Sequence, residues 1–371
     1  METRPAFAII NRAVIKSNYN QLRKSVGKGV GLLAVVKANA YGHGAVEAAK
    51  TLEHAGCGFF GVAICEEGIE LREAGIKASI IILGGVYPNQ IRDTIKYKLT
   101  PVIFDIETAR LINNLSKKAG KRTKVHVKVD TGMGRLGLLP NQIVPFFQEL
   151  KGLANIEIEG ILSHFSEADE EDKRFSHEQL GIFLEIIKVV KEFGVKPQLV
   201  HIANSAAITE HTNSHFNLVR PGIMLYGAYP ARRMIGKIKL KPVMRLVTHV
   251  VQLKRVSKDF PVSYGRKYVT KRDSVIAAIP IGYGDGYPRH LSNKGEVLIR
   301  GQRARVAGMV CMDITMLDVT HIEGINERDE VVLIGRQGMD EITADELAEK
   351  AGTISYEILC GITSRVPRIY V

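Results

Sequence analysis

The stretch LLAVVKANAYGHG, residues 32–44, joins a short apolar run to a lysine and then to a polar loop. Residues 32–36 are continuously apolar, include β-branched side chains and are flanked by glycines, a pattern typical of a strand buried on both faces. Lys37 stands at the end of this strand. A charged amine at that position is either solvated in a loop or held in a cleft for chemistry.

The same succession of an apolar run, a loop and an amphipathic helical pattern recurs as far as about residue 227. The apolar runs number eight and cover residues 32–37, 58–64, 78–84, 100–105, 124–130, 156–165, 198–205 and 218–227. Apolar residues at helical spacing separate most of them, as in residues 44–56, 65–75 and 178–194. Eight alternating βα units favour a parallel (β/α)8 barrel over an open sheet. The eighth helix would have to lie in residues 229–239, where the pattern is weakest.

The pattern changes after about residue 239 to short alternating strands separated by turns. Only residues 343–352 form a clear helical pattern there, with Thr343 as the expected N-cap. We therefore expect an α/β chain with a (β/α)8 barrel over residues 1–238, which carries Lys37, and a mainly β domain over residues 239–371. The first strand, about residues 6–14, can pack with the second domain rather than with the barrel.

Composition is typical of a soluble globular protein. Hydrophobic residues make up 45% of the chain and charged residues 24%. No apolar run reaches the length of about 18 residues that suggests a membrane span, and the start lacks a signal-peptide pattern, so we expect a cytoplasmic protein without a membrane partner.

The net charge is +12, but the 51 lysines and arginines are spread along the chain, which argues against a nucleic-acid partner. The scattered cysteines, Cys57, Cys65, Cys311 and Cys360, argue against a disulfide framework or a zinc knuckle.

In a barrel of this kind, functional residues gather at the carboxyl ends of the strands. The residues at or just beyond those ends are Lys37, Lys128, Asp130, Arg135, His164, Asn204, Ser205, Arg220 and Gly222. A single lysine at a strand end is more often solvated than functional. The whole set is polar and cationic, however, and it points to one face.

Seven stretches resemble the pyridoxal-phosphate-dependent alanine racemases, in the order in which that family has them. They are AVVKANAYGHG (34–44), VKVDTGMGRLG (127–137), HIANSAA (201–207), VRPGIMLYG (219–227), SYGRKY (263–268), IPIGYGDGYPR (279–289) and GMVCMDITMLDV (308–319). The resemblance covers essentially the whole chain. It implies interconversion of L-alanine and D-alanine with pyridoxal 5'-phosphate, a reaction that supplies D-alanine for cell-wall peptidoglycan.

The resemblance assigns two opposed bases, Lys37 and Tyr264. Lys37 forms the Schiff base with the cofactor aldehyde, which requires a neutral amine at the moment of attack, and burial in a cleft favours that form. The D-enantiomer's α-proton is assigned to Lys37 and the L-enantiomer's to Tyr264. An unperturbed tyrosine titrates near pH 10, so a phenolate at Tyr264 needs cationic neighbours. His164 and Arg220 would extend from it as a hydrogen-bonded network.

The resemblance also assigns residues to each part of the cofactor. Arg220 faces the pyridine nitrogen, and because arginine has no acceptor it cannot support a protonated ring, which makes the ring a weaker electron sink. The residues that the resemblance places around the cofactor, mainly its phosphate, are Tyr41, His164, Asn204, Ser205, Gly222, Ile223 and Tyr356. Gly222 allows close approach because it has no side chain.

The substrate residues implied by the resemblance come from both domains. Arg135 pairs with the substrate carboxylate, and Lys128 matches a lysine that the family carbamylates to orient that arginine. Met312 donates its backbone amide from the partner subunit, with Tyr283 and Asp313 at the entrance. The site would therefore be complete only in a homodimer with two shared active sites.

Three other protein classes account for less of this sequence than a racemase does. A phosphate-binding barrel lyase or decarboxylase shares Lys37 but does not explain SYGRKY or GMVCMD, and a cofactor-carrier barrel lacks a second domain. A metal hydrolase needs clustered ligands, whereas His211 and His215 are spaced four apart without the HExxH glutamate, so we expect no metal. Substrate breadth stays open, because one methylene changes discrimination by only about 1–3 kcal/mol.

Overall fold

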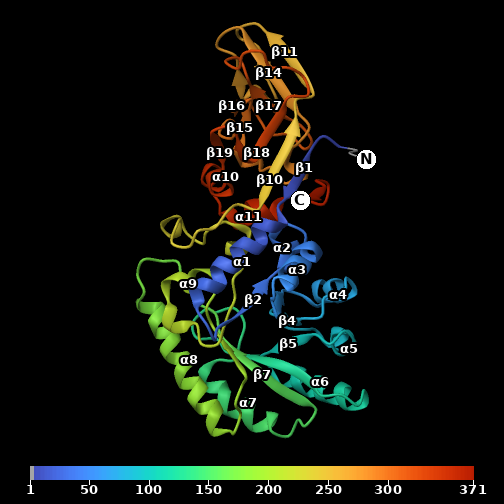
Figure 1. Ribbon diagram of the computed structural model, residues 1–371, viewed down its shortest axis with the longest axis vertical. Coiled ribbons are helices and arrows are strands. Elements are labelled where there is room, and N and C mark those ends of the chain that lie inside the picture. Colours follow the sequence, from blue (N-terminus) through green and yellow to red (C-terminus); the bar gives the residue numbers. More distant parts are fainter. Residues whose placement is uncertain (1–3) are drawn as a thin grey trace.

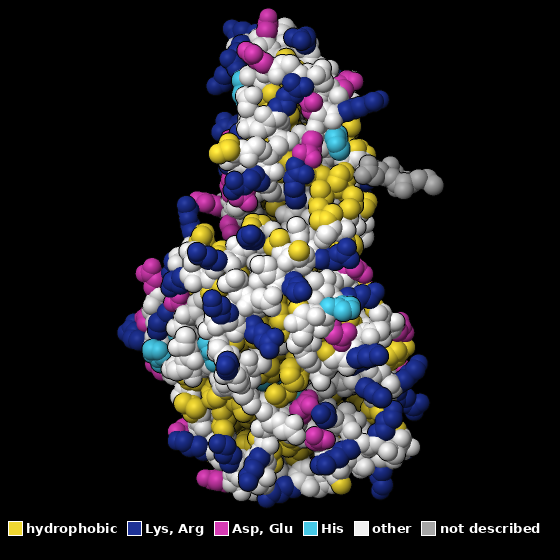
Figure 2. Space-filling view, viewed as in Figure 1, with side chains coloured by type: hydrophobic (Ala, Val, Ile, Leu, Met, Phe, Trp, Pro, Cys, Tyr) yellow, Lys and Arg dark blue, Asp and Glu magenta, His cyan; other side chains and the backbone are white. Residues whose placement is uncertain are grey.

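The structure is a computed structural model that describes residues 4–371. Figure 1 shows two parts stacked along the long axis, a ring of parallel strands and helices below and a mainly β part above. Lysine and arginine side chains are scattered over both parts on the face seen in Figure 2, interspersed with acidic ones. Within the described residues, no helix combines the length and apolarity needed to cross a membrane.

The lower part is a nearly closed eight-stranded parallel barrel. Its strands are hydrogen-bonded in the order β8-β7-β6-β5-β4-β3-β2-β9. They are β2 (Gly31–Val35), β3 (Phe59–Val62), β4 (Ser79–Ile82), β5 (Thr100–Ile103), β6 (Thr123–Lys128), β7 (Ile156–Leu162), β8 (Leu199–His201) and β9 (Leu218–Val219). Just beyond β8 and β9, Arg220 N donates to Ala203 O at 2.9 Å and links the two ends of this order. Each predicted apolar run overlaps one of these strands, which confirms the predicted (β/α)8 class.

Helices cover the outside of the barrel and bury their apolar faces against the strands. They are α3 (Ala45–His54), α4 (Cys65–Glu73), α5 (Ile91–Lys96), α6 (Ile106–Lys118), α7 (Ile143–Leu150), α8 (Arg174–Glu192) and α9 (Ser205–Glu210).

The expected eighth helix is not found in residues 229–239, which contain only the 3-10 turn η5 (Arg232–Met234). Helix α1 (Arg12–Val26), from the start of the chain, packs beside the last barrel unit instead. The buried Asn18 side chain donates to Leu225 O at 3.1 Å and to Lys241 O at 2.8 Å, and accepts from Lys241 N at 2.9 Å. A helix that arrives from the other end of the sequence thus takes the place that the local pattern could not fill.

The upper part is a ten-stranded sheet in the order β11-β14-β17-β16-β15-β18-β10-β1-β20, with β19 paired to β18, and a small β12-β13 sheet. Its strands are β1 (Phe7–Ile10), β10 (Met244–His249), β11 (Gln252–Val256), β12 (Pro261–Val262), β13 (Tyr268–Val269), β14 (Ser274–Ile279), β15 (Glu296–Ile299), β16 (Gln302–Val306), β17 (Thr315–Asp318), β18 (Glu330–Gln337), β19 (Asp340–Ile342) and β20 (Arg368–Tyr370). The mainly β second part is therefore confirmed as a fold class.

Strand β1 belongs to this upper sheet, where it pairs antiparallel with β10 and parallel with β20. It is shorter than the expected run over residues 6–14, because helix α1 begins at Arg12. The side chain of Asn11 accepts from Val14 N at 3.1 Å, which caps the helix and ends the strand.

Two helices accompany the upper sheet. Helix α10 (Ala344–Ala351) starts as expected at Thr343, whose Oγ1 accepts from Glu346 N at 3.0 Å. Helix α11 (Ser355–Gly361) has no counterpart in the expected pattern. It lies at the junction of the two parts in Figure 1 and brings Tyr356 to the mouth of the barrel.

Candidate active site

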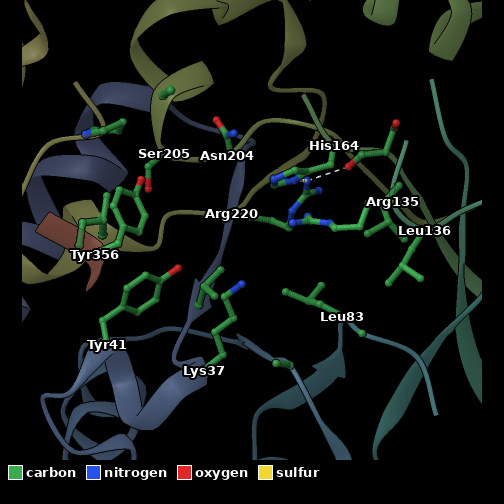
Figure 3. A pocket seen from close by; sticks show the side chains of 18 of the residues that line it. Lys37, Tyr41, Leu83, Arg135, Leu136, His164, Asn204, Ser205, Arg220 and Tyr356 are labelled. Carbon is green, nitrogen blue, oxygen red and sulfur yellow. Dashed lines mark hydrogen bonds between the residues drawn. The ribbon is translucent and has the colours of Figure 1, made fainter. Parts of the chain in front are cut away.

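A cavity of about 450 Å³ opens at the carboxyl ends of the barrel strands, below helix α11. This is the place where enzymes of this architecture hold their substrates, and the volume suits a small cofactor with a substrate. The expected residues that line it are Lys37, Tyr41, Lys128, Arg135, His164, Asn204, Ser205, Arg220, Ile223 and Tyr356. In Figure 3 Lys37 and Arg220 lie between Tyr41, Ser205 and Tyr356 on one side and Arg135 with Leu136 on the other.

Lys37 leaves strand β2 into a left-handed turn, marked α2 (Lys37–Tyr41) in Figure 1. Ala38, Asn39, Ala40 and Tyr41 all have positive φ, between 51° and 54°. Such a conformation costs an L-residue roughly 1–2 kcal/mol, and a run of four non-glycine residues is held only by its surroundings. The turn fixes the directions in which Lys37 and Tyr41 leave the backbone.

Two side chains hold this turn in place. The carboxylate of Glu67, from helix α4, accepts from Ala38 N at 2.6 Å and from Ala63 N at 2.7 Å. The side chain of Asn39 accepts from Ala45 N at 2.8 Å, which joins the turn to the start of helix α3. Strain in the turn after Lys37 is therefore balanced by hydrogen bonds to neighbouring elements.

The amine of Lys37 is half-buried and surrounded by cations. Burial, and after it the guanidinium of Arg135, lowers its pKa from the ordinary value, while Glu67 opposes this shift weakly. A lowered pKa increases the fraction of neutral amine, the form that attacks carbonyl carbon and accepts protons.

Hydroxyl groups lie close together around Gly222, at the end of the cavity opposite Arg135. Gly222 N donates to Ser205 Oγ at 2.8 Å. A β-carbon on Gly222 would lie 2.4 Å from the hydroxyl oxygen of Tyr41, so only glycine allows that hydroxyl to come so near the turn. The rings of Tyr41 and Tyr356 are 6.0 Å apart, and burial raises the pKa of both. These protonated hydroxyls suit an anion.

Arg220 occupies the middle of the floor and is 4% exposed. Its NH2 group donates to Ser163 O at 2.7 Å, to Ile202 O at 2.9 Å and to Nδ1 of His164 at 3.0 Å. Burial, then Arg135, lowers its pKa to about 9, which leaves the guanidinium charged at neutral pH. Burial and the charge on Arg220 lower the pKa of His164 well below its ordinary value, so this imidazole is neutral.

Asp130 organises the loop that carries Arg135. One carboxylate oxygen accepts from the backbone amides of Gly132, Met133 and Gly134 at 2.8–3.1 Å, and the other accepts from Arg135 N at 3.1 Å. These bonds lower the pKa of Asp130 despite its partial burial. Asp130, a strand-end residue, thus acts on the backbone rather than on the cavity.

Lys128, at the end of strand β6, is buried close to the same cations. Burial, then Arg220 and Arg135, lowers its pKa to about 8. A substantial neutral fraction at physiological pH is unusual for lysine and makes the amine nucleophilic.

Four expected residues of the upper part lie outside the cavity of the single chain, over residues 4–371. Tyr264 is 72% exposed, Met312 53% and Tyr283 41%, while Asp313 pairs with Arg365 at 2.6 Å on the surface. The segments that carry them lie next to one another in the upper part, because Tyr283 N donates to Cys311 O at 3.0 Å and Ser263 Oγ lies 3.6 Å from Cys311 Sγ.

Sequence reasoning missed several residues of the cavity. Leu83 and Leu136 form part of its wall, and His201 holds Arg220 from behind. Leu83 follows strand β4 directly, so the strand-end rule that identified its neighbours would have found it. Glu67 leaves no such signal, because it reaches the turn from within a helix.

Comparison with known proteins places this geometry in a family. Residues 10–230 match the family model "Alanine racemase, N-terminal domain" and residues 243–370 match "Alanine racemase, C-terminal domain". The chain is 48% identical over 368 residues to an alanine racemase of Halothermothrix orenii, covering 99% of this chain and 97% of that protein.

Solved structures give the same result. An alanine racemase of Clostridium difficile 630 superposes with a TM-score of 0.95 at 39% identity, over 100% of this chain and 96% of that one. The alanine racemase of Bacillus anthracis with bound L-Ala-P superposes with a TM-score of 0.94 at 37% identity, over 99% of this chain and 95% of that one.

Proposed function

The chain belongs to the alanine racemase family and is a racemase, and from that premise we propose that it interconverts L-alanine and D-alanine with pyridoxal 5'-phosphate and two bases, Lys37 and Tyr264. The observation that supports this most directly is the position of the Lys37 amine between hydroxyl groups at one end of the cavity and Arg220 at the floor. The D-alanine formed would serve the synthesis of cell-wall peptidoglycan.

The residues of the cavity fit pyridoxal 5'-phosphate at each of its polar groups. Tyr41, Ser205 and Tyr356, with the turn at Gly222, form a cradle for phosphate into which a β-carbon on Gly222 would intrude. Arg220 would meet the pyridine nitrogen, and Lys37 would hold the aldehyde carbon covalently. When bound, the cofactor withdraws electrons from the α-carbon of the substrate and so acidifies its proton.

Lys37 would act as the base on one face of the substrate. Its lowered pKa favours an amine that is free to accept the α-proton at Nζ and to return it. The left-handed turn after Lys37 keeps the amine directed into the cavity, and Glu67 maintains that turn.

Arg220 would keep the ring nitrogen unprotonated. A guanidinium has five donors and no acceptor, so it would donate to the nitrogen lone pair and could not accept a hydrogen bond from a protonated ring. This limits how far charge from the α-carbon spreads into the ring, and it favours return of the proton to the α-carbon rather than to another atom.

At the other end of the substrate, Arg135 would bind the carboxylate. The neutral Lys128 amine could add to carbon dioxide through a new N–C bond and lose one proton to solvent, which would give a carbamate whose negative charge orients Arg135. This would replace repulsion between two neighbouring cations by attraction.

The second base would come from a second copy of the chain. Tyr264 is exposed and lies outside the cavity of its own chain, as do Tyr283 and Met312 from neighbouring segments. Exposed aromatic and methionine side chains of this kind are typical of protein interfaces. We place the partner subunit's Tyr264 opposite Lys37, in a symmetric dimer with two shared sites. The four free thiols support a reducing, cytoplasmic setting.

The proposed activity is tested by incubating the purified chain with pyridoxal phosphate and L-alanine, and separately with D-alanine, and following both enantiomers by chiral chromatography. Formation of each enantiomer from the other supports the proposal. Release of ethylamine and carbon dioxide would identify a decarboxylase instead, and no reaction of alanine would refute the proposal. The same assay with L-serine and bulkier amino acids defines substrate breadth.

A further inference from the structure

A line of buried polar side chains runs from Arg220 into the barrel, away from the cavity. NH1 of Arg220 lies 2.9 Å from Nδ1 of His201, Nε2 of His201 lies 2.9 Å from Nδ1 of His126, and Nε2 of His126 lies 3.3 Å from Oε2 of Glu159. Both histidines are fully buried, and Glu159 is 4% exposed. Polar groups in such an interior cost stability unless they are fully paired.

The strands are shaped around this line. Val125 is paired with Ile158 but His126 is paired with Gly160, so a bulge leaves Glu159 as an extra residue in β7. A β-carbon on Gly160 would lie 2.6 Å from Nδ1 of His126, so glycine makes room for the imidazole. Bulges are a usual means of redirecting a side chain. Here the bulge supplies a carboxylate to the inside of the barrel.

Hydrogen-bond directions along the line follow from Arg220, which only donates. Nδ1 of His201 must accept from it, so the proton of this neutral imidazole lies on Nε2 and is donated to Nδ1 of His126. The proton of His126 then lies on Nε2 and is donated to Glu159, which accepts. Burial lowers the pKa of both histidines, which keeps them neutral.

Glu159 completes the line as an anion. Burial raises its pKa, but hydrogen bonds from His126 and Lys124 outweigh burial and lower the pKa overall. Lys124 Nζ lies 2.7 Å from Oε1, and its side chain is about half exposed at the amino end of strand β6. The two ends of the line, a donor-only guanidinium and an acceptor-only carboxylate, therefore require the same pair of histidine tautomers.

We propose that Glu159, His126 and His201 are positioning residues for Arg220, which they hold in one orientation by a hydrogen-bonded line with fixed tautomers. Within residues 4–371, the hydrogen bonds that hold the guanidinium use NH1 and NH2 and leave Nε–H available to a group in the cavity that Arg220 lines. The inference rests on the proposed function in one respect, that Arg220 meets the cofactor ring. By this proposal the carboxylate of Glu159, on the side of Arg220 away from the cavity, also influences how strongly Arg220 binds the cofactor ring.

The tautomers are tested by nitrogen-15 NMR on the full-length chain labelled in histidine, after removal of the cofactor. Two-bond couplings distinguish a protonated Nδ1 from a protonated Nε2, and variants His126→Gln and His201→Gln assign the two signals. The proposal expects both imidazoles to carry their proton on Nε2. A proton on Nδ1 of either ring would overturn it.

The positioning role is tested by a double-mutant cycle in the holoenzyme. Glu159→Gln keeps the shape but removes the charge, and Lys124 is then free to move into solvent. We expect Glu159→Gln to lower kcat about 10- to 100-fold, the range for residues that orient a functional histidine, with KM for alanine changed less than about threefold. In an Arg220→Lys background, where the guanidinium that the line would orient is already absent, the same change should cost less than about threefold.

Glu157→Gln is the matched control, because Glu157 lies two residues away on the same strand and is only partly buried. It should leave kcat within about twofold and the two histidine signals unchanged. Equal losses from Glu159→Gln in the wild-type and Arg220→Lys backgrounds would show a general structural effect and refute positioning through Arg220. The expected tautomers in a chain that does not racemise alanine would refute the proposed function instead and leave the hydrogen-bonded line in place.

Discussion

The hydroxyl of Tyr41 stands over Gly222 at a distance that excludes any side chain there: a β-carbon would come within 2.4 Å of it. The two residues belong to opposite ends of the barrel sequence and meet only through its near closure, because β2 pairs with β9. Their contact defines the part of the cavity that we assign to phosphate.

Gly222→Ala should therefore weaken binding of pyridoxal phosphate. Overpacking costs about 1–3 kcal/mol, equivalent to an increase in Kd of roughly 5- to 150-fold. Titration of the cofactor-free chain, followed by cofactor absorbance, measures this. Gly181→Ala is the control, since Gly181 is exposed in helix α8 with no atom near its would-be β-carbon, and it should leave Kd unchanged. An unchanged Kd for Gly222→Ala would contradict the assignment.

Lys37→Ala should abolish both covalent attachment of the cofactor and racemisation in either direction, since one amine serves as anchor and as base. Borohydride reduction followed by mass spectrometry of the intact chain should add a pyridoxyl group to the wild type and none to the variant. Lys50→Ala, at a partly exposed position in helix α3, provides the control and should keep both properties. A reduced adduct that persists on the Lys37→Ala chain would mean that another residue is the anchor.

Tyr264→Phe keeps the ring but removes the ionisable oxygen, so cofactor binding should survive while the rate falls about 10²–10⁴-fold. With alanine deuterated at the α-carbon, the isotope effect should increase more when the reaction starts from L-alanine than from D-alanine. Steady-state rates from both directions measure this asymmetry. Equal changes in both directions would argue against a base dedicated to one enantiomer.

Mixing Lys37→Ala with Tyr264→Phe subunits tests whether the two bases come from different chains. Each mixed dimer would contain one intact site, so an equal, randomly exchanged mixture should recover about a quarter of wild-type activity. Native mass spectrometry verifies that mixed dimers form. If they form and stay inactive, both bases belong to one chain or the two-base scheme is wrong.

The buried Lys128 cation predicts a pH-dependent stability. Its pKa is about 8 in the folded chain, against about 10.4 when unfolded, so below pH 8 the folded state bears the full cost of the buried charge. Between these values the unfolded state binds more protons, and stability rises with pH. Lys128→Met should be more stable than wild type at pH 7, by a difference that shrinks as pH approaches 10.4.

Urea unfolding midpoints at matched protein concentration, in buffers free of carbon dioxide, measure that difference. Lys121→Met, at an exposed position just before strand β6, is the control and should show no such trend. A Lys128→Met chain that gains stability equally at every pH would point to better packing rather than to removal of a charge.

The strands of the barrel could be predicted because each is a short apolar run whose burial depends on its own residues, as in β2. The cavity residues that follow those strands, such as Lys37 and Arg220, were predictable for the same reason. Their chemical roles came from the resemblance, since a lysine at a strand end is compatible with several kinds of site.

Three features could not be predicted from local patterns. Helix α1 replaces the eighth barrel helix through contacts of Asn18 with residues more than 200 positions away. Helix α11 is seven residues long and starts without a side-chain cap at Ile354, so it gives no start signal. The left-handed turn after Lys37 is made mostly of alanine and asparagine, and alanine favours ordinary helices; only contacts with Glu67 and helix α3 select the left-handed form.

The place of β1 between β10 and β20 has a consequence for synthesis on the ribosome. Its antiparallel partner β10 begins at Met244 and its parallel partner β20 at Arg368. The first strand therefore leaves the ribosome long before either partner has been synthesised. At about 5–20 residues per second, the roughly 230 residues up to β10 take on the order of 10–50 s to translate. During that time the barrel can assemble, while the strand that precedes it remains without its sheet. In the sequence, the barrel thus separates β1 from all the other strands of the upper sheet. The sheet cannot be completed until β20, at the end of the chain, has been synthesised.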